Sequence, residues 1–544
     1  MNNAQNFFSK ISKAKIFRSS FFWIVISGVL TSLTLYSKYL FFLTWISIIP
    51  LCYFLIKHKD SIRKCFLLVL LWALSFYLVL YTWFLFTQPM TIMGFDEWQD
   101  ILIKNLNWLG VSLAQSLQMS LVGLAYGLIK PKGIWSPLVL GALWIVLEWA
   151  QGYGELAMVW GRLALSQYNF APIIQSASLF GSLFVSFLII CVNGLIALYL
   201  WLLINQKISK KSLYIAAALV FLVNLCFGYT RIAVVNSSIK KSHTVPIAAV
   251  QADLPADIKW SLQKSEIFKM HYDLTVDAIN NGAKVIIWPE TIILTALEYS
   301  MFYDDLKNLV NDKQITLIVG SYNHDEEGNS YNALYCLDYA IQDYQVYRKR
   351  QLVPLGEFVP YQDLLNKFKF LEKFNLFEND VNPGKEAVVF NTSYGDFSGL
   401  ICFDSIFQRF SYESVQKGAQ VLFIGTNDSW YLGTAAIQQH YGHAVLRAVE
   451  NNRFVVRAAN AGVSGIISCT GKTIKELGSR KTGYIMYEVP LINQKSLYAI
   501  TGDIIAYIAL ASAIVAFAYF RLLHNKKLFS NAQKNLLTHK INNK

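Results

Sequence analysis

Apolar stretches long enough to cross a lipid bilayer are the feature that most constrains how this chain folds. A membrane-spanning helix needs about 20 predominantly apolar residues, and such stretches lie on both sides of one long polar block. Because 54% of the residues are hydrophobic and only 15% are charged, the composition indicates a membrane protein with a soluble part. Eight spanning helices are expected, at about 20–36, 39–56, 65–86, 108–129, 134–151, 179–204, 212–229 and 503–523.

The charges of the connecting segments predict the orientation of these helices. Lys and Arg are concentrated in every second segment, and positively charged segments stay in the cytoplasm. Both termini are therefore expected in the cytoplasm and the polar block on the far side, which is the periplasm of a bacterium with two membranes. The net charge of +13 is explained by this pattern, so no nucleic-acid partner is expected. The basic segments are 1–19, 57–64, 130–133, 205–211 and 521–544, and the alternate ones are 87–107 and 152–178.

The spans divide the chain into four parts. Residues 1–229 are expected to form a membrane domain of about seven helices, and residues 230–502 an extracytoplasmic domain. Residues 503–523 form a last transmembrane helix, and residues 524–544 a basic cytoplasmic tail. Inside the polar block, strand-like runs alternate with helix-like segments, which predicts an α/β domain with helices on both faces of its sheets. The strand-like runs are 245–251, 284–289, 315–321, 332–338, 386–391, 397–402, 420–425, 454–458, 463–468 and 482–488.

The cysteines show no pattern of a metal site. All seven are scattered, without a Cys-x-x-Cys pair and without Cys/His spacing typical of zinc ligands. No metal and no cofactor is therefore expected. Cys336 and Cys469 of the polar block are either paired in a disulfide or, as we expect, free buried thiols.

Three reactive side chains stand at the ends of strand-like runs in the polar block. Glu290 closes Val-Ile-Ile-Trp-Pro-Glu, Lys349 follows Tyr-Arg, and Cys402 follows Ser-Gly-Leu-Ile. A carboxylate can take a thiol proton, a thiol can hold an acyl group covalently, and an ammonium can stabilise an oxyanion. These residues lie far apart in the chain, so spacing does not establish that they meet. Each also has another interpretation, as a loop-capping Glu, a solvated Lys or a buried small thiol.

The sequence around these residues resembles the carbon–nitrogen hydrolase (nitrilase) superfamily, and within it a membrane-embedded branch that acylates lipoproteins. Three motifs carry the resemblance in order: Trp-Pro-Glu, then Lys-x-x-Leu-Val-Pro-x-Gly-Glu-x-Val-Pro, then Gly-Leu-Ile-Cys-Phe-Asp. The resemblance spans about residues 140 to 470. Further matching segments are 147–149, 172–188, 251–255 with Trp260, 426–431, 439–440, 447–450 and 457–464.

The resemblance implies a fold and a set of roles. The fold is an α-β-β-α sandwich attached to a multi-pass α-helical membrane domain. Cys402 is the expected nucleophile, Glu290 the general base and Lys349 the cation that stabilises the oxyanion. Glu357, eight residues after Lys349, is the expected second Glu that supports this triad, because one acid can orient the ammonium while the other handles protons.

Other positions are expected to shape the substrate pocket. Trp260 and Trp430 would line the entrance and grip acyl chains, with Asn427 as a further substrate-binding residue; the alternative for the tryptophans is ordinary aromatic packing. Three positions depart from the family pattern. Gln351 stands where His is common, and the supporting residues Phe403 and Asp404 stand where Tyr-Glu is common. These departures put details of the pocket in doubt, but they leave the triad intact.

The resemblance implies a two-step acyl transfer. An acyl chain would pass from a phospholipid to Cys402 as a thioester, and then to the free α-amino group of the diacylglyceryl-cysteine at the N-terminus of an apolipoprotein. This reaction is the last step of lipoprotein maturation, and the expected protein is a monomer of the bacterial inner membrane. Two other functions share some of these features: a membrane-tethered amidase or nitrilase, and a non-catalytic scaffold that binds lipoproteins.

Overall fold

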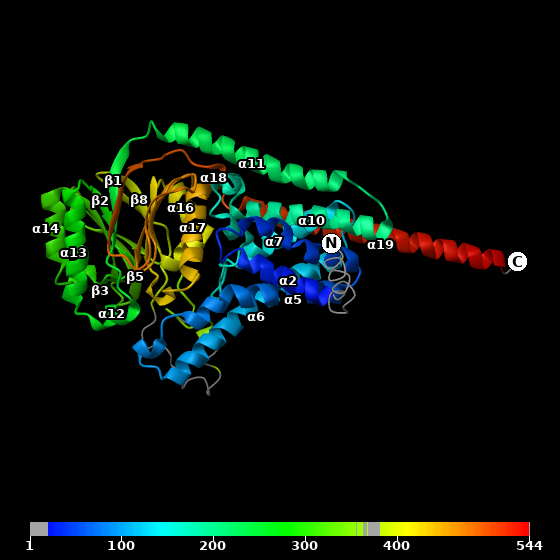
Figure 1. The fold of residues 1–544 in the computed structure, drawn as a ribbon, viewed down its shortest axis with the longest axis horizontal. Helices are drawn as coiled ribbons and strands as arrows, with labels where there is room; N and C mark the ends of the chain where they lie inside the picture. The colour runs from blue at the N-terminus through cyan, green and yellow to red at the C-terminus, as the bar shows by residue number, and fades with distance from the viewer. Residues whose placement is uncertain (1–19, 355, 363–366, 368–380, 543–544) are drawn as a thin grey trace, which may run out of the picture.

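The computed structural model describes residues 20–354, 356–362, 367 and 381–542, and it shows a helical region beside a domain of stacked sheets (Figure 1). In this part of the chain, six helical segments are long and apolar enough to cross a membrane. Two other expected spans coincide with shorter apolar helices, α2 (Ser20–Leu33) and α7 (Trp135–Ala150). A helix is therefore present at each expected position, but eight full spans stay a prediction. The six segments are Phe41–His58, Ile62–Phe86, Glu97–Ile129, Ser182–Gln206, Ser212–Ile239 and Ile504–Leu523.

Small residues let the helices of this region pack closely. α6 (Glu97–Ile129) packs along α5 (Ile62–Leu80), where a Cβ on Gly123 would lie only 2.3 Å from the carbonyl oxygen of Cys65. α7 packs along α10 (Ser182–Gln206), where a Cβ on Gly194 would lie 2.6 Å from Pro137. Close approach through glycine is typical of helix pairs in membranes, where the hydrophobic effect does not drive association.

Three helices extend beyond their apolar runs. α6 begins at Glu97 because Asp96 and Gln99 form a capping box at its N-terminus. α11 continues past the expected end at residue 229 to Ile239, and β1 follows at Thr244. α19 (Ile504–Asn542) continues through the expected basic tail as helix (Figure 1). The connection between the helical region and the sheets therefore lies at 240–243 rather than at 229–230.

The second region contains two sheets. The first is seven-stranded in the order β13-β1-β2-β4-β5-β6, with β3 beside β4, and the second is six-stranded in the order β12-β11-β10-β9-β8-β7. Parallel pairs at the centre of each sheet bring strand ends to a common edge. The strands are β1 (Thr244–Gln251), β2 (Val285–Ile287), β3 (Ile293–Ala296), β4 (Thr316–His324), β5 (Ser330–Asp338), β6 (Gln345–Arg348), β7 (Val389–Thr392), β8 (Gly395–Ile401), β9 (Val421–Asn427), β10 (Phe454–Asn460), β11 (Ser464–Ile467), β12 (Thr473–Leu477) and β13 (Gly483–Pro490).

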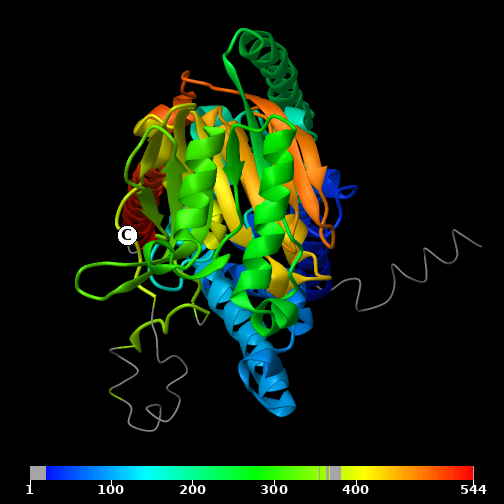
Figure 2. The ribbon, with the colours of Figure 1, turned by 90° about the vertical axis from the view of Figure 1, so that its left-hand side faces the viewer.

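The sheets stack face to face with helices on both outer faces. Ile247 and Ile287 of the first sheet and Phe397 and Val456 of the second belong to one buried cluster. α13 (Lys264–Asn280) and α14 (Tyr303–Lys313) cover the first sheet and lie in front of it in Figure 2. α16 (Gln408–Gln416) and α17 (Ala436–Asn451) cover the second. The expected α-β-β-α sandwich is therefore confirmed.

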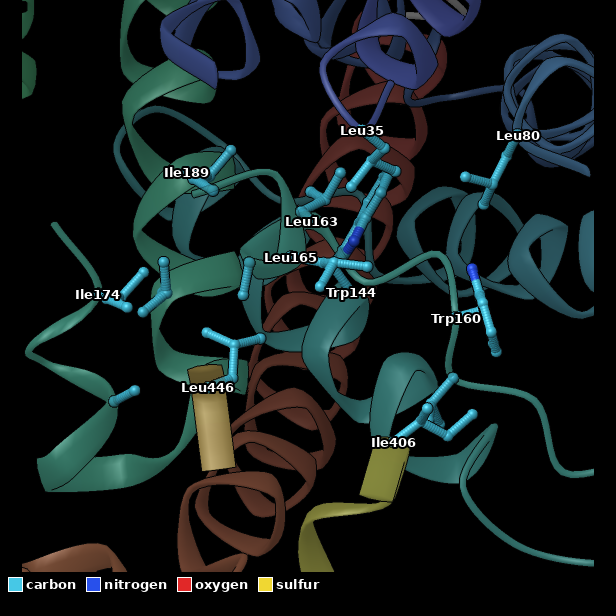
Figure 3. Close-up of a cluster of buried hydrophobic side chains, with 14 of the residues drawn as sticks. Leu35, Leu80, Trp144, Trp160, Leu163, Leu165, Ile174, Ile189, Ile406 and Leu446 are labelled. Carbon is cyan, nitrogen blue, oxygen red and sulfur yellow. The ribbon is translucent and has the colours of Figure 1, made fainter. Parts of the chain in front are cut away.

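Helix α17 joins the sandwich to the helical region. Every residue of α17 except Gln438 is buried, which a helix on the outer face of a free sandwich would not achieve. One hydrophobic cluster extends from the membrane helices to this layer, and Figure 3 shows Leu446 and Ile406 of the sandwich in the same cluster as Leu165 and Trp160 of the helical region. The two regions therefore share a core.

Buried polar contacts also hold this joint between the sandwich and the helical region. Oε1 of Glu450, at the end of α17, accepts a hydrogen bond from the backbone N–H of Ser182 at 2.9 Å, so a sandwich carboxylate caps the N-terminus of membrane helix α10. Arg447 donates to both carboxylate oxygens of Glu450, at 2.6 and 2.8 Å. Trp160 Nε1 donates to Gln439 Oε1 at 2.8 Å. These bonds set the orientation of the sandwich on the helices.

We predict that Glu450→Gln destabilises the protein strongly. The substitution leaves the guanidinium of Arg447 buried without its carboxylate, and breaking a buried ion pair costs about 3–5 kcal/mol. The temperature at which half of the detergent-purified protein unfolds should fall by several degrees. The matched control is Glu386→Gln, which removes the exposed ion pair with Lys417 and should leave this temperature nearly unchanged. Equal midpoints for the two variants would show that the joint does not depend on Glu450.

Candidate active site

The three candidate side chains lie where three strands end. Glu290 follows β2 after Trp288 and Pro289, Lys349 directly follows β6, and Cys402 directly follows β8. The loop that carries Glu290 crosses β4 at Gly320, where a Cβ would lie 2.1 Å from the carbonyl oxygen of Pro289 and 2.8 Å from Cα of Glu290. Only glycine therefore allows the Glu290 loop to pass this close to β4.

A buried ammonium lies between two carboxylates. Lys349 Nζ is 3.0 Å from Glu290 Oε1 and 2.8 Å from Glu357 Oε1, and only 1% of the Lys349 side chain is exposed. Burial lowers the pKa of Lys349, but the carboxylates of Glu290 and Glu357 outweigh this effect and raise the pKa well above its ordinary value. Lys349 is therefore charged, and the expected proximity of Glu290, Lys349 and Glu357 is seen in the structure.

Amide groups hold both carboxylates in place. Asn332 Nδ2 donates to Glu290 Oε1 at 2.8 Å and to Glu357 Oε1 at 3.2 Å. The other oxygens accept backbone N–H groups, Glu290 Oε2 from Asn427 at 2.9 Å and Glu357 Oε2 from Val353 at 2.8 Å. Asn332 was not expected from the sequence; its only signal is an amide side chain just before the apolar middle of strand β5.

Cys402 adopts a backbone conformation that side-chain-bearing residues rarely take. Its φ is +47°, in the left-handed region, and such strain clusters at functional sites. The Cys402 side chain is buried. Burial raises the pKa of the thiol, the carboxylate of Glu290 raises it further, and the ammonium of Lys349 lowers it. Cys402 therefore lies within electrostatic reach of both groups and is protonated at rest.

Asp404 connects the segment after β8, which carries Cys402, with the segment after β6, which carries Lys349. It accepts hydrogen bonds from Tyr347 Oη and the backbone N–H of Gln351, both at 2.7 Å, and from the backbone N–H of Arg350 at 3.2 Å. Burial raises the pKa of Asp404 to about 6, opposed by Lys349. The shorter Asp side chain therefore reaches the loop after Lys349, although a Glu is common at this position.

The other two departures from the family pattern face inward. Gln351 Oε1 accepts a hydrogen bond from Arg409 Nη2 at 3.0 Å. The ring of Phe403 is buried and packs edge-to-face on Phe407, with ring centroids 5.1 Å apart. Both rings belong to the shared hydrophobic cluster, so the apolar Phe403 fits its surroundings.

The expected substrate-binding residues occupy different settings. The backbone N–H of Asn427 donates a hydrogen bond to Glu290 Oε2. Its side-chain Oδ1 accepts a hydrogen bond from Asn460 Nδ2 at 3.0 Å. Trp430 is half-buried, and its carbonyl oxygen accepts the backbone N–H of Gln88 from the helical region at 3.0 Å. Trp260 lies in α12 (Ala256–Ser261), but its side chain lies outside the described part. Substrate contacts of all three remain predictions.

Aromatic side chains of the helical region border the site. Trp83 packs on Tyr431 with ring centroids 5.4 Å apart, and Trp160 does so at 6.2 Å. Burial raises the pKa of the Tyr431 hydroxyl, and the nearby Cys402 raises it further. An aromatic wall of Trp83, Trp160 and Tyr431 thus lies where the helical region meets the sandwich.

A second buried lysine was not expected from the sequence. Lys259 is 2% exposed, and its Nζ donates to Thr291 Oγ1 at 3.2 Å, next to Glu290. Burial lowers the pKa of Lys259 to about 8, opposed by Glu290. The described residues contain no group of three His, Cys, Asp or Glu side chains that could hold a metal ion, and Cys336 and Cys469 are free thiols.

Comparison with known proteins gives matches along most of the chain. A family model described as "Apolipoprotein N-acyltransferase N-terminal domain" matches residues 27–195, and one described as "Carbon-nitrogen hydrolase" matches residues 246–496. The apolipoprotein N-acyltransferase of Gloeobacter violaceus is 27% identical over 87% of this chain and 88% of its own length. The enzyme of Thermotoga maritima is 25% identical (91% and 93%), and that of Geobacter metallireducens is 28% identical (93% and 96%).

Two solved structures are similar to about half of this chain. Nit3 of Saccharomyces cerevisiae, of the nitrilase superfamily, is 19% identical with a TM-score of 0.37, covering 49% of this chain and 94% of its own. An amidase from Nesterenkonia sp. is 19% identical with a TM-score of 0.36, covering 46% and 91%.

The sandwich with its buried Glu-Lys-Cys cluster defines a domain of the carbon–nitrogen hydrolase class, here joined to a helical membrane region. The two family models and the curated relatives identify the branch of that class. The chain belongs to the apolipoprotein N-acyltransferase family, and it is an acyltransferase.

We predict that Lys349→Met slows alkylation of Cys402. The ammonium lowers the pKa of the thiol, so its removal raises that pKa and reduces the thiolate fraction at any pH between about 7 and 9. Because the thiolate is the reactive form, the rate should fall about tenfold for each unit of the shift. Iodoacetamide labelling, quantified by mass spectrometry on the peptide that contains Cys402, measures the rate.

The matched control for this experiment is Arg348→Met. Arg348 precedes Lys349 but donates to Asn323 Oδ1 and lies over the ring of Tyr331, away from the site. Its removal should leave the alkylation rate within about twofold of the rate in the unsubstituted protein, because a solvent-screened charge acts weakly on the thiol. Equal rates for Lys349→Met and the unsubstituted protein would contradict the electrostatic assignment.

We also predict that Gly320→Ala displaces Glu290 and lowers acyl transfer. The added Cβ would lie 2.1 Å from the carbonyl oxygen of Pro289, so the loop must move. A shift of about 1 Å in a catalytic group can cost about 100-fold in rate. The control is Gly478→Ala, because a Cβ on Gly478 meets no atom within 4 Å. If both variants transfer acyl groups at the same rate, the close approach has no role in placing Glu290.

Proposed function

We propose that the protein transfers a fatty acyl chain from a phospholipid, through a thioester on Cys402, to the free α-amino group of the N-terminal diacylglyceryl-cysteine of apolipoproteins. This is the last step of lipoprotein maturation. One observation carries the proposal: a buried Lys349, held between Glu290 and Glu357, beside a buried thiol in a left-handed conformation. The names of the curated relatives support the choice of substrates.

The first step loads the enzyme. Glu290 takes the proton of Cys402, and the thiolate attacks the ester carbonyl carbon of a phospholipid acyl chain. Lys349 stabilises the negative charge on the carbonyl oxygen of the tetrahedral intermediate. The carbon–oxygen bond of the ester then breaks, and Glu290 returns its proton to the lysophospholipid oxygen that leaves. A thioester remains on Cys402.

The second step transfers the chain to the acceptor. The α-amino group of the diacylglyceryl-cysteine attacks the thioester carbonyl, and Lys349 again stabilises the oxyanion. Glu290 takes a proton from the amine and gives it to the sulfur as the carbon–sulfur bond breaks. An amide and the free thiol of Cys402 result. Because an amide is more stable than a thioester, this step runs downhill.

Glu357 has a separate task in this scheme. When Glu290 carries a proton, it no longer compensates the charge of Lys349. Glu357 stays 2.8 Å from the ammonium and keeps it charged in the buried site. The oxyanion is thus stabilised in both steps, whichever group holds the transferred proton.

The position of the site supports lipid substrates. The aromatic wall of Trp83, Trp160 and Tyr431 lies where the helical region meets the sandwich, and it makes the surroundings of the site apolar, as an acyl chain requires. The shared core between α17 and the helical region keeps this wall in place. A dry, apolar site also protects a thioester from hydrolysis.

The proposed location follows the charges of the loops. The sandwich faces the periplasm, both termini lie in the cytoplasm, and the protein acts as a monomer of the bacterial inner membrane. The helices up to Ile239, with about seven spans, form the membrane domain, and residues 503–523 form the last span. Both substrates are anchored by acyl chains, so they reach the site from the outer leaflet of this membrane.

An assay with purified protein separates this function from the two others. Phospholipid with a radiolabelled acyl chain is supplied together with a diacylated lipopeptide. We expect label in the lipopeptide as an amide. Release of the label as free fatty acid would favour a hydrolase, and neither product would favour a scaffold. The products of this one assay thus distinguish the three functions.

We predict that Cys402→Ala abolishes this N-acylation, because the substitution removes the thiol that is proposed to carry the acyl chain between the two substrates. Cys402→Ser should also fail to form a thioester. The matched control is Cys469→Ala, which removes another buried free thiol of the sandwich and should retain most of the activity. Acyl transfer that persists in Cys402→Ala would refute the assigned nucleophile.

A further inference from the structure

A buried Asp–His pair lies directly behind Cys402 and takes no part in the steps above. His440, on α17, places Nδ1 2.9 Å from Asp428 Oδ1 and Nε2 3.1 Å from the carbonyl oxygen of Cys402. The same Nε2 is 3.1 Å from Ser405 Oγ. His440, Asp428 and Ser405 are each at most 1% exposed. The pair therefore contacts the backbone of the candidate nucleophile and no solvent.

The carboxylate of this pair is firmly held. Arg457 Nη2 donates to Asp428 Oδ2 at 2.6 Å, and Thr426 Oγ1 donates to Asp428 Oδ1 at 3.0 Å. Burial raises the pKa of Asp428, but Arg457 and then His440 lower it well below its ordinary range. Asp428 is therefore an ionised acceptor that fixes the orientation of the imidazole, as outer partners do for functional histidines.

The other side of the ring acts on Cys402. The carboxylate of Asp428 and the carbonyl oxygen of Cys402 only accept hydrogen bonds. The ring therefore carries both protons, and it donates from Nδ1 to Asp428 and from Nε2 to Cys402 at 3.1 Å. Ser405 Oγ donates to the same oxygen at 2.7 Å. Two donors thus converge on the peptide group after Cys402. A left-handed conformation in a residue other than glycine persists only where surrounding contacts hold it.

The helical region also contacts the imidazole ring of His440. The ring centroid of Trp160 is 5.5 Å from that of His440, and Trp160 Nε1 donates to the neighbouring Gln439. Trp160 belongs to the segment between α7 and η5 (Leu163–Gln167). The backbone of Cys402 is thus connected through His440 to the helical region.

We propose that His440 is a positioning residue, which holds Cys402 in its left-handed conformation and so keeps the thiol aligned with Glu290 and Lys349. Asp428 and Trp160 act through His440 by fixing its ring. This inference rests on the proposed role of Cys402 as nucleophile, but it assigns a task to residues that do not touch the reacting atoms.

The test compares two histidines of the same helix. His443 is as buried as His440 and also lies beside Trp160, at 6.0 Å between ring centroids, but its Nε2 has no hydrogen-bond partner in the described part of the chain. We expect His440→Leu to lower kcat about 100-fold with KM for phospholipid within about twofold, because misplacing a reacting group by about 1 Å has such an effect. His443→Leu should change kcat less than threefold, roughly.

Two further variants separate positioning from folding. His440→Gln retains an N–H donor and should recover part of the lost kcat, which a purely structural loss would not require. Ser405→Ala removes the other donor to the Cys402 carbonyl oxygen with little change of volume and should also lower kcat. The loss in the double variant His440→Gln/Ser405→Ala should be less than the product of the single losses, because both act on one peptide group.

A second measurement keeps this test independent of the proposed reaction. The rate at which iodoacetamide alkylates Cys402 in substrate-free protein should fall in His440→Leu and stay unchanged in His443→Leu. If the protein transferred no acyl chain at all, this difference would still be expected. Equal alkylation rates and equal kcat values in the two Leu variants would overturn the assignment of His440.

Discussion

A buried ammonium between two carboxylates is the interaction on which the rest of the site depends. Lys349 carries its charge in an apolar setting only because Glu290 and Glu357 lie within 3.0 Å of it. One carboxylate would neutralise the ammonium and leave no group free for proton transfer. With two, Glu290 can gain and lose a proton while Glu357 keeps Lys349 charged. Asn332 links both carboxylates and so fixes the spacing of the whole cluster.

The second constraint is the joint between the sandwich and the membrane helices. Helix α17 is buried on both sides, and its end residue Glu450 caps membrane helix α10. The same helix carries His440, which contacts the backbone of Cys402. The candidate site is therefore built at the boundary of the two regions.

Much of this architecture was predictable from the sequence, for physical reasons. Apolar runs mark helices because lipid excludes polar side chains. Glu290, Lys349 and Cys402 were found from short sequence motifs at the ends of strand-like runs. Helix limits were less predictable: α6 starts at a polar capping box outside its apolar run. Asn332, His440 and Glu450 could not be assigned, because their partners lie far away in the chain. Glu450 caps a helix 268 positions earlier, and no local pattern records that contact.

If Cys402 carries the acyl chain, the thioester itself is the most direct test of the proposed function. Purified protein is incubated with phospholipid in the absence of any acceptor, digested at mildly acidic pH and analysed by mass spectrometry. We expect the added mass of one fatty acyl chain on the peptide containing Cys402, removable by hydroxylamine and absent from Glu290→Gln. An acyl group on another of the chain's free cysteines, or N-acylation of the lipopeptide without any acylated Cys402, would contradict this expectation.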